Sequence, residues 1–387
     1  MAKNKNKRKV LVLNGIETYN KGAELMLYAI LQEIERKYPD AIVYLPYGAY
    51  QKDLSYIKTN LDLRNIPHYK IRRFLIKSRI GGILRRLHLP YQFITENNNV
   101  KDVDYFLDGS GFAISDQWKP SNLTINRWKA LVNKYGYKKS KMVFLPQAFG
   151  PALQDNTKKL MSIISDGADI IMPREDISEE WLIKSGVNNR KIYKFTDFTN
   201  LVEGEFPQKY QNLKNGISII PNARMIDKGI ISKENYLKIL SLIIEIGRTT
   251  NHPVYLLNHE GKGDEELALE CVKSFPDIEF VNELNALEVK GLISSAYICI
   301  SSRFHGVASA LNSCVPCLAT SWSHKYEELY KDYGLSGMVL NLKDLDSIKS
   351  KVLEIVDPKI NQEIRDKLMQ AKPYIQTQTR LMWKEIW

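Results

Sequence analysis

Short apolar runs that alternate with helical patterns recur along this chain and constrain what it can fold into. The run KVLVLNG at residues 9–15 precedes a segment whose apolar side chains fall at i, i+3, i+4, i+7, i+8 and i+11 between Ala23 and Ile34, and the run AIVYLPY at 41–47 follows. Apolar residues at that spacing share one face of a helix. A strand, a helix and a strand in this order build parallel sheets. The pattern therefore predicts an α/β protein.

The alternation comes in two series, with a polar segment between them. Residues 196–215, TDFTNLVEGEFPQKYQNLKN, show no periodicity and are interpreted as a linker. At 387 residues the chain is too long for one ordinary core. We therefore expect two α/β domains, residues 1–200 and 201–387, facing across a cleft, with the amphipathic end TQTRLMWKEIW packing back as a helix. The remaining strand-like runs are VDYFLDGSG, KMVFLPQAFGP and DIIMPRE in the first domain and GISIIP, PVYLLNH, IEFVN, YICI and PCLATS in the second.

The positive charge of the chain is concentrated in a few places. The formal net charge is +11, and the stretch 64–90 contains basic residues but no acidic one. Between Asp62 and Glu96 the basic residues are Arg64, Lys70, Arg72, Arg73, Lys77, Arg79, Arg85 and Arg86. Apolar side chains are interleaved with them, as in helices that lie on membrane surfaces. Two interpretations stay open, docking on an anionic inner leaflet and a solvated loop that covers the first domain.

Several classes of protein are excluded. No apolar run approaches the ~18–20 residues of a membrane span. The N-terminus lacks the apolar region and cleavage site of a signal peptide, so we expect a cytoplasmic protein associated with the inner face of the membrane. Signatures of nucleic-acid-binding modules are absent, so nucleic acid is not an expected partner. Cys314 and Cys317 form a lone CxxC pair without a second ligand pair, so neither a metal nor a cofactor is expected.

The segment SSRFHGVASALNSCVP at 301–316 places an arginine and a histidine where a strand runs into a helix. In open parallel sheets ligands gather outside the carboxyl ends of the strands. The start of a helix attracts anions, and the guanidinium of Arg303 can grip a carboxylate or phosphate there. His305 can transfer a proton near neutral pH. The alternative is a structural arginine paired to an acid beside a satisfied histidine.

Other strand ends add candidate ligands. Lys325, in SWSHKYEEL, and Arg174, in IIMPRED, can supply positive charge for an anionic ligand. The alternatives are that Lys325 is an ordinary lysine at a helix start and that Arg174 forms a salt bridge with Glu175 or Asp176. His259, in LLNHEGKGDEE, is expected to line the cleft with Asp264. Further substrate contacts are expected from loop residues of the first domain and from one asparagine of the second, namely Asn20, Lys21, Gly22, Asp108, Ser110, Gly111 and Asn222.

Taken together, the strand-end segments resemble the polysaccharide pyruvyl transferase family over roughly residues 14–335. The segments, in order, are NKGAELML, FLDGSGFAISD, LPQAFGP, PREDIS and SSRFHGVASALNSCVPCLATSWSHKYEEL. The last is the most specific, because it combines R-x-H-G with a later proline and lysine. Two positions depart from the family pattern, DGSG in place of a triple-glycine turn and Ala23 in place of an aspartate.

The resemblance implies two Rossmann-like domains of the GT-B-like kind and phosphoenolpyruvate as the donor substrate. Pyruvate would be placed as a ketal across two hydroxyls of a sugar in a cell-surface polysaccharide or lipid-linked glycan precursor, with release of phosphate. Arg174, Arg303 and Lys325 match the positions that the family uses for the donor, and His305 matches its catalytic histidine. A glycosyltransferase of GT-B type with a nucleotide-sugar donor is the alternative, with Glu283 or Glu288 as the acid that would contact the ribose.

Overall fold

The computed structural model describes residues 7–45, 57–65, 100–320 and 324–387. The basic stretch 64–90 lies outside the described residues except for its first two positions, so its docking on a membrane stays a prediction. Of the helices in the described part of the chain, none combines the length and the apolar character that crossing a bilayer requires.

The chain divides into two compact units. Unit 1 comprises Met1–Thr18, Ile30–Phe195 and Trp383–Trp387, and unit 2 comprises Tyr19–Ala29 and Thr196–Met382. The continuous ranges 1–200 and 201–387 that the sequence suggests place Tyr19–Ala29 in the first domain and Trp383–Trp387 in the second, whereas each segment belongs to the other unit. The C-terminal exchange has an aromatic basis, since the Trp387 ring meets the rings of Tyr38 and Tyr105 in unit 1 edge to face.

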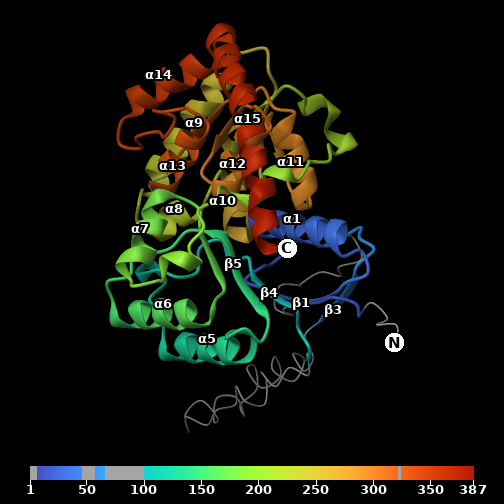
Figure 1. Cartoon of the computed structure of the whole chain (residues 1–387). Helices are drawn as coiled ribbons and strands as arrows, with labels where there is room; N and C mark the ends of the chain where they lie inside the picture. The colour runs from blue at the N-terminus through green and yellow to red at the C-terminus, as the bar shows by residue number, and fades with distance from the viewer. Residues whose placement is uncertain (1–6, 46–56, 66–99, 321–323) are drawn as a thin grey trace, which may run out of the picture. The chain divides into compact units, whose positions relative to one another are not determined.

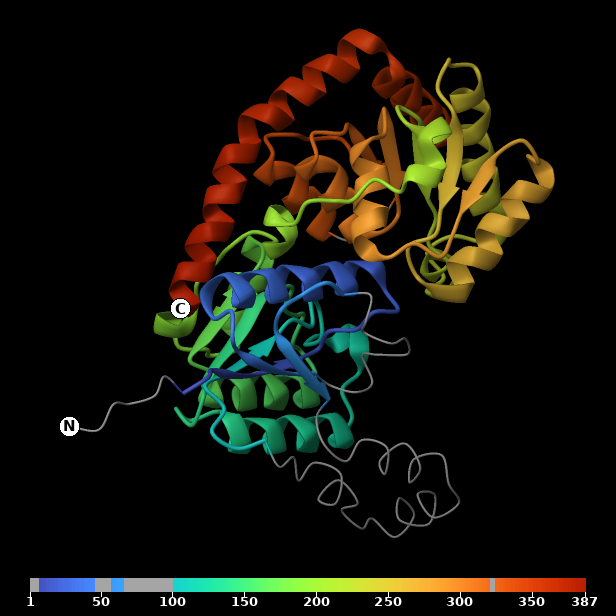
Figure 2. The ribbon, with the colours of Figure 1, turned by 90° about the vertical axis from the view of Figure 1, so that its right-hand side faces the viewer.

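Unit 1 is built on a six-stranded parallel sheet in the order β3-β2-β1-β4-β5-β6. Two of its helices, α5 and α6, pack side by side on one face and cover Phe106 and Phe144 (Figures 1 and 2). Its elements are β1 (Val10–Asn14), β2 (Ile42–Leu45), β3 (Asp62–Asn65), β4 (Tyr105–Asp108), α5 (Asn122–Tyr135), β5 (Lys141–Gln147), α6 (Asp155–Gly167), β6 (Ile170–Pro173) and α7 (Asp176–Lys184). Helix α1 (Lys21–Lys37) begins in unit 2 and ends in unit 1.

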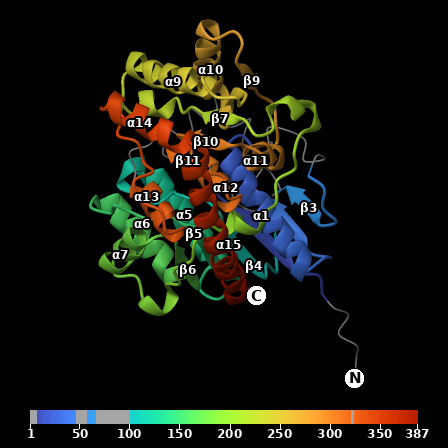
Figure 3. The ribbon, with the colours of Figure 1, turned by 90° about the horizontal axis from the view of Figure 1, so that it is seen from above.

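Unit 2 holds a five-stranded parallel sheet in the order β11-β10-β7-β8-β9. Helices α9 and α14 pack on each other, and so do α11 and α12, as Figure 3 shows for the first pair. Its elements are β7 (Ile217–Ile220), α8 (Arg224–Asp227), α9 (Lys233–Arg248), β8 (Val254–Leu257), α10 (Gly261–Ser274), β9 (Glu279–Val281), α11 (Ala286–Ser294), β10 (Ile298–Ser301), α12 (Phe304–Asn312), β11 (Cys317–Ala319), α13 (His324–Asp332), α14 (Leu345–Val356) and α15 (Pro358–Ile386).

Helix starts follow capping chemistry that is visible in the sequence. Ser232 accepts a hydrogen bond from the Asn235 N–H at the start of α9, and Asp344 does the same for Ser347 at the start of α14. Asn285 and Glu288 form a capping box at the start of α11. These local signals explain why each helix begins where its strand-to-helix loop ends.

Both sheets reverse their strand order at a central strand. In unit 1 the chain moves outward from β1 in one direction and from β4 in the other, and in unit 2 the same happens at β7 and β10. This is the doubly wound arrangement of Rossmann-like domains, whose ligands bind at the switch point. The predicted class, α/β with two Rossmann-like domains, is confirmed. In unit 2 the switch point lies where β7 and β10 end, immediately before Arg303.

Candidate active site at the strand ends of unit 2

The Arg303 backbone marks the transition from strand to helix. Strand β10 ends at Ser301, Arg303 occupies the N-cap position of α12 with φ −110° and ψ 131°, and α12 begins at Phe304. The Arg303 N–H donates to the Ser301 hydroxyl at 3.0 Å. His305 is therefore in the first turn of α12, where unpaired backbone N–H groups favour anions.

The Arg303 side chain is held by two carboxylates. Its Nε and Nη2 donate to the two oxygens of Asp264 at 2.9 and 2.6 Å, and its Nη1 donates to Glu260. Arg303 and Asp264 are both buried. Arg224 donates to the same Glu260 carboxylate, so two arginines balance two acids. The structure thus supplies the acid pairing that the sequence left open, and it fixes the guanidinium at the switch point.

Asp264 has a raised pKa because its carboxyl is buried, and the Arg303 guanidinium opposes that rise. The Ala223 N–H also donates to Asp264 at 2.9 Å. A buried carboxylate of this kind depends on its arginine partner to remain charged.

The loop before α1 belongs to unit 2, although the sequence suggests that it lies in the first domain. Lys21 N–H donates to the His259 carbonyl at 3.1 Å, and Asn20 Nδ2 donates to Glu260 Oε2 at 2.8 Å. The Asn20 Oδ1 in turn accepts from the Gly22 N–H at 2.8 Å and caps α1. These contacts tie the loop to residues more than two hundred positions away, which no local pattern reveals.

The His305 imidazole lies between α1 and the segment that follows residue 196. A Cβ at Gly22 would stand 2.3 Å from His305 Nδ1 and 2.7 Å from its Cγ. On the other side, His305 Nε2 is 3.4 Å from Asp197 Oδ2. The ring is thus confined on both sides, and only 12% of the side chain is exposed.

Replacing Gly22 by alanine is expected to lower kcat by about 10-fold or more and to leave the protein folded. The new methyl group must displace the imidazole, and misplacement by about 1 Å can lower a rate by about 10²-fold. Alanine itself suits a helix better than glycine, so unfolding should not be promoted. Gly263→Ala in α10 is the matched control, since its Cβ would meet the Ala223 Cβ at 3.1 Å. Steady-state kinetics and thermal unfolding of both variants test this, and equal activities would contradict it.

Three other predicted residues also lie in unit 2. Asn222 Nδ2 donates to the Ser302 carbonyl at 3.0 Å, which links the ends of β7 and β10. His259 is buried, and burial lowers its pKa well below 6.5, so its ring is neutral. Lys325 Nζ is 5.5 Å from the centroid of the Phe304 ring, which meets the His305 ring edge to face at 5.3 Å. Lys325 thus shares an aromatic neighbour with His305.

The remaining predicted residues lie in unit 1. Asp108, at the end of β4, is buried and accepts hydrogen bonds from Asn14, Ser110 and Gln147 at 2.6, 2.8 and 2.9 Å. Burial raises the pKa of Asp108. Its carboxyl therefore organises the switch point of the first sheet, beside Gly111, which has a φ of +70°.

Arg174, also in unit 1, follows β6 directly. Its backbone N–H donates to the Gln147 carbonyl at 3.1 Å, and its Nε is 3.8 Å from Glu175 Oε2. The side chain is buried. The pairing with Glu175 is the one that the sequence allowed as an alternative, and it holds Arg174 at the carboxyl end of the first sheet.

Sequence reasoning missed three of the groups at this site. Glu260, the N-cap residue of α10, stands four positions before Asp264, which the sequence already predicted to line the cleft, and this i, i+4 spacing could have been noticed. Arg224 follows β7 in the same way. Asp197 gave no signal, because it lies in the aperiodic segment 196–215.

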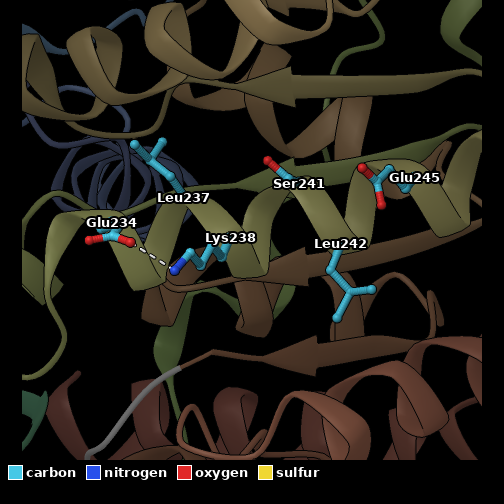
Figure 4. Close-up of a pocket in the computed structure, with 6 residues that line it drawn as sticks. All are labelled: Glu234, Leu237, Lys238, Ser241, Leu242 and Glu245. Atoms are coloured by element: carbon cyan, nitrogen blue, oxygen red, sulfur yellow. Dashed lines mark hydrogen bonds and ion pairs between the residues drawn. The ribbon is translucent and has the colours of Figure 1, made fainter.

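A groove on the outer face of α9 does not resemble this site. It has a volume of about 430 Å³ and is lined by Glu234, Leu237, Lys238, Ser241, Leu242 and Glu245, as Figure 4 shows. Lys238 Nζ is paired with Glu234 at 2.7 Å. Two carboxylates and one neutralised ammonium do not suit an anionic donor. Among the described residues there is also no cluster of His, Cys, Asp and Glu that could hold a metal.

Comparison with known proteins identifies a matching family and a similar protein. A family model described as polysaccharide pyruvyl transferase matches residues 20–324. The amylovoran biosynthesis protein AmsJ of Erwinia amylovora is 22% identical over 306 residues, which cover 72% of each chain.

Solved structures resemble the fold. Alr3699/HepE of Anabaena in complex with UDP-glucose has a TM-score of 0.58 at 13% identity and is covered to 98%, as is this chain. The UDP-GlcNAc 2-epimerase of Methanocaldococcus jannaschii has a TM-score of 0.55 at 12% identity, with 91% of this chain and 94% of that chain covered. These likenesses confirm the GT-B-like fold class.

Proposed function

Because the chain belongs to the polysaccharide pyruvyl transferase family, we propose that it transfers pyruvate from phosphoenolpyruvate to a sugar of a cell-surface polysaccharide or a lipid-linked glycan precursor. The product is a pyruvate ketal across two hydroxyls, and phosphate is released. The observation that carries this proposal is the first turn of α12, where a fixed guanidinium, a confined imidazole and helix N–H groups occur together.

The charges of unit 2 suit a small anionic donor. Arg303 and Arg224 are balanced by Glu260 and Asp264, so a bound anion must be neutralised by other groups. Three of the five N–H groups of Arg303 donate to these carboxylates, which leaves two N–H groups for a ligand. Lys325 and the start of α12 are proposed to neutralise the phosphate and carboxylate of the donor. Arg174 of unit 1 is proposed as a further donor contact.

The chemistry needs one proton at carbon. In the proposed reaction His305 delivers a proton to C3 of phosphoenolpyruvate, and a sugar hydroxyl adds to C2. The C2–O bond to phosphate then breaks, and the second hydroxyl closes the ketal. Two hydroxyl protons are lost, one proton is gained at C3, and the other leaves with hydrogen phosphate. Contacts with the substrates are proposed for Asn20 to Gly22, Ser110, Gly111, Asn222 and His259.

A nucleotide-sugar glycosyltransferase is the second candidate function. The solved relatives with bound UDP or UDP-glucose share the fold, and that likeness alone favours this alternative. Its ribose would need a free acid in unit 2. Glu288 accepts a hydrogen bond from the Asn285 N–H at 3.0 Å within the capping box of α11, so its carboxylate is already engaged. Glu283, the other acid that the sequence offers for the ribose, is exposed, so the binding measurements below decide between the two donors.

The reaction is proposed to take place in the cytoplasm, where phosphoenolpyruvate is available, on an acceptor that is carried by a membrane lipid. Docking of the basic stretch 64–90 on the anionic inner leaflet belongs to the same proposal. No cofactor or metal is included in it.

Calorimetry tests the donor directly. The wild-type protein is expected to bind phosphoenolpyruvate in preference to UDP-glucose or UDP-GlcNAc. Lys325→Met should weaken the binding of phosphoenolpyruvate by about 10–100-fold, because a hydrogen bond to a charged group contributes about 1.5–3 kcal/mol. Lys331→Met on the same helix is the control, since Lys331 pairs with Glu328. Tight binding of a nucleotide sugar without binding of phosphoenolpyruvate would move the protein to the second function.

A further inference from the structure

Asp197 faces the imidazole of His305 from the side opposite α1. Its Oδ2 is 3.4 Å from His305 Nε2, and the Asp197 side chain is 1% exposed. Asp197 lies just before a short 3₁₀ helix, Phe198–Leu201, in the segment that enters unit 2. The carboxylate and the imidazole come from positions more than one hundred residues apart and meet in one buried place.

The Asp197 carboxylate is itself fixed. Its Oδ1 accepts a hydrogen bond from the Thr199 N–H at 2.9 Å and another from the Thr199 hydroxyl. The Thr199 carbonyl accepts from Lys290 Nζ at 3.1 Å, and the same ammonium donates to Asn312 Oδ1 at 3.1 Å on α12. The carboxylate is thus part of a buried network that reaches the helix on which His305 stands. One oxygen is used to build this network, and the other is directed at the imidazole.

The two ring nitrogens of His305 differ in their surroundings. Nε2 is shielded from solvent and forms no hydrogen bond within the described residues, and its 3.4 Å approach to Asp197 Oδ2 is a contact at ion-pair distance. Nδ1 lies against Gly22, since a Cβ at that position would stand 2.3 Å from it. Because Nε2 is the ring nitrogen at ion-pair distance from Asp197, the N–H of a neutral ring is best placed on Nε2, toward the carboxylate.

We propose that Asp197 is a positioning residue for His305, holding the imidazole with its Nε2–H toward the carboxylate and leaving Nδ1 to transfer the proton. The catalytic part of this inference rests on the proposed function. The carboxylate fixes the tautomer and the ring orientation, and its negative charge stabilises the imidazolium form.

Several other charges act on the same ring. Arg303 precedes it on the α12 side, and His259 interacts with it electrostatically from the end of β8. Lys21 at the start of α1 acts on His259 in the same way. Lys325 on α13 stands near it across the Phe304 ring, and Lys290 on α11 lies beyond Asp197. Within the described residues, Asp197 is the acid whose carboxylate lies at ion-pair distance from the imidazole.

The first experiment uses Asp197→Asn. The amide can still accept from Thr199 but carries no charge, so kcat is expected to fall by about 10²-fold while KM for phosphoenolpyruvate changes by less than about threefold. Removal of the anion disfavours the imidazolium. The limb of the kcat–pH profile that reports His305 should therefore move to lower pH, whichever protonation state is active.

Two comparisons separate positioning from general structural damage. Asp344→Asn removes the charge of another capping aspartate in unit 2 and should retain parental kinetics. In a His305→Gln background, Asp197→Asn should lower kcat no further, because its effect passes through the imidazole. An unchanged pH profile, or a full additional loss in the His305→Gln background, overturns the proposal.

A measurement on the free wild-type protein separates this inference from the proposed function. Nitrogen-15 NMR of histidine-labelled protein, with the His305 signals identified by their loss in His305→Gln, should show the neutral ring protonated at Nε2. A ring protonated at Nδ1 overturns the proposal even if Asp197→Asn fails to fold. If phosphoenolpyruvate turnover is absent but the Nε2–H tautomer is found, the positioning of His305 stands and the donor assignment fails.

Discussion

Replacing His305 by glutamine is expected to lower kcat by about 10²–10⁴-fold, while phosphoenolpyruvate still binds within a few-fold of its wild-type affinity. The range is that of general acid–base catalysis by a positioned side chain. Glutamine can form hydrogen bonds in the confined space between Gly22 and Asp197, but it cannot deliver a proton to carbon. Arg303 and Lys325, the proposed donor contacts, are left in place. The rate of phosphate release measures kcat, and calorimetry measures the affinity for phosphoenolpyruvate.

His252→Gln is the matched control for this experiment. His252 also lies in unit 2, where its ring stacks on Tyr297 at 3.8 Å and its Nδ1 is 2.7 Å from the Asn215 carbonyl. We expect it to retain parental turnover. If His305→Gln turns over at the wild-type rate, the imidazole is not the proton donor. If it loses donor binding as completely as turnover, His305 serves binding instead.

Replacing Arg303 by methionine is expected to lower the free energy of unfolding by about 3–5 kcal/mol at pH 7 to 8, in addition to weakening donor binding. Removing one partner of a buried ion pair leaves the other charge uncompensated. Here two acids lose their partner, Asp264 completely and Glu260 in part, since Arg224 still contacts Glu260. Urea unfolding at several pH values measures the loss.

The loss of stability should depend on pH in a defined direction. Burial already raises the pKa of Asp264, and the guanidinium opposes that rise. Without Arg303 the carboxyl has a still higher pKa in the folded protein than in the unfolded chain. A group of this kind holds its proton in the folded state, so stability falls as pH rises through its folded-state pKa. Arg303→Met should therefore come closer to wild-type stability near pH 5 than at pH 8.

Two further variants test whether the uncompensated charge of Asp264 causes the loss of stability. Arg303→Met combined with Asp264→Asn removes the uncompensated charge and should recover part of the stability, so that donor binding can be measured on folded protein. Arg365→Met removes a half-buried arginine that donates to the carbonyls of Cys314, Ala296 and Tyr297. It should destabilise the protein without the same dependence on pH. A parental unfolding curve for Arg303→Met at pH 8 would contradict the importance of the pair.

The repeating elements and the position of the site on one sheet could be predicted from the sequence because they depend on local patterns. Apolar periodicity marks strands and helices, and the carboxyl ends of parallel strands meet at one edge of a sheet. Arg303 and His305 follow β10 directly, so their location needed no knowledge of distant contacts. Asn222 and His259 were placed by the same reasoning.

The partners of these residues could not be predicted in the same way. Asn20 pairs with Glu260, and Gly22 packs against His305, only because a loop between β1 and α1 joins the other unit. Asp197 reaches His305 from a segment that has no periodicity. Long-range pairings of this kind depend on the packing of the whole unit, and neither composition nor spacing encodes them visibly.

The segment Tyr19–Ala29, which comprises the end of the loop before α1 and the first turns of that helix, also has a consequence for the order in which the protein is made. The hydrogen bond from Asn20 to Glu260 joins residues 240 positions apart. At a synthesis rate of about 5–20 residues per second, the second partner leaves the ribosome about 12–48 s after the first. Until then the segment that will confine His305 has no place to dock. The proposed active site is therefore completed late in synthesis, when the strands of the first sheet, β1 to β6, have already left the ribosome.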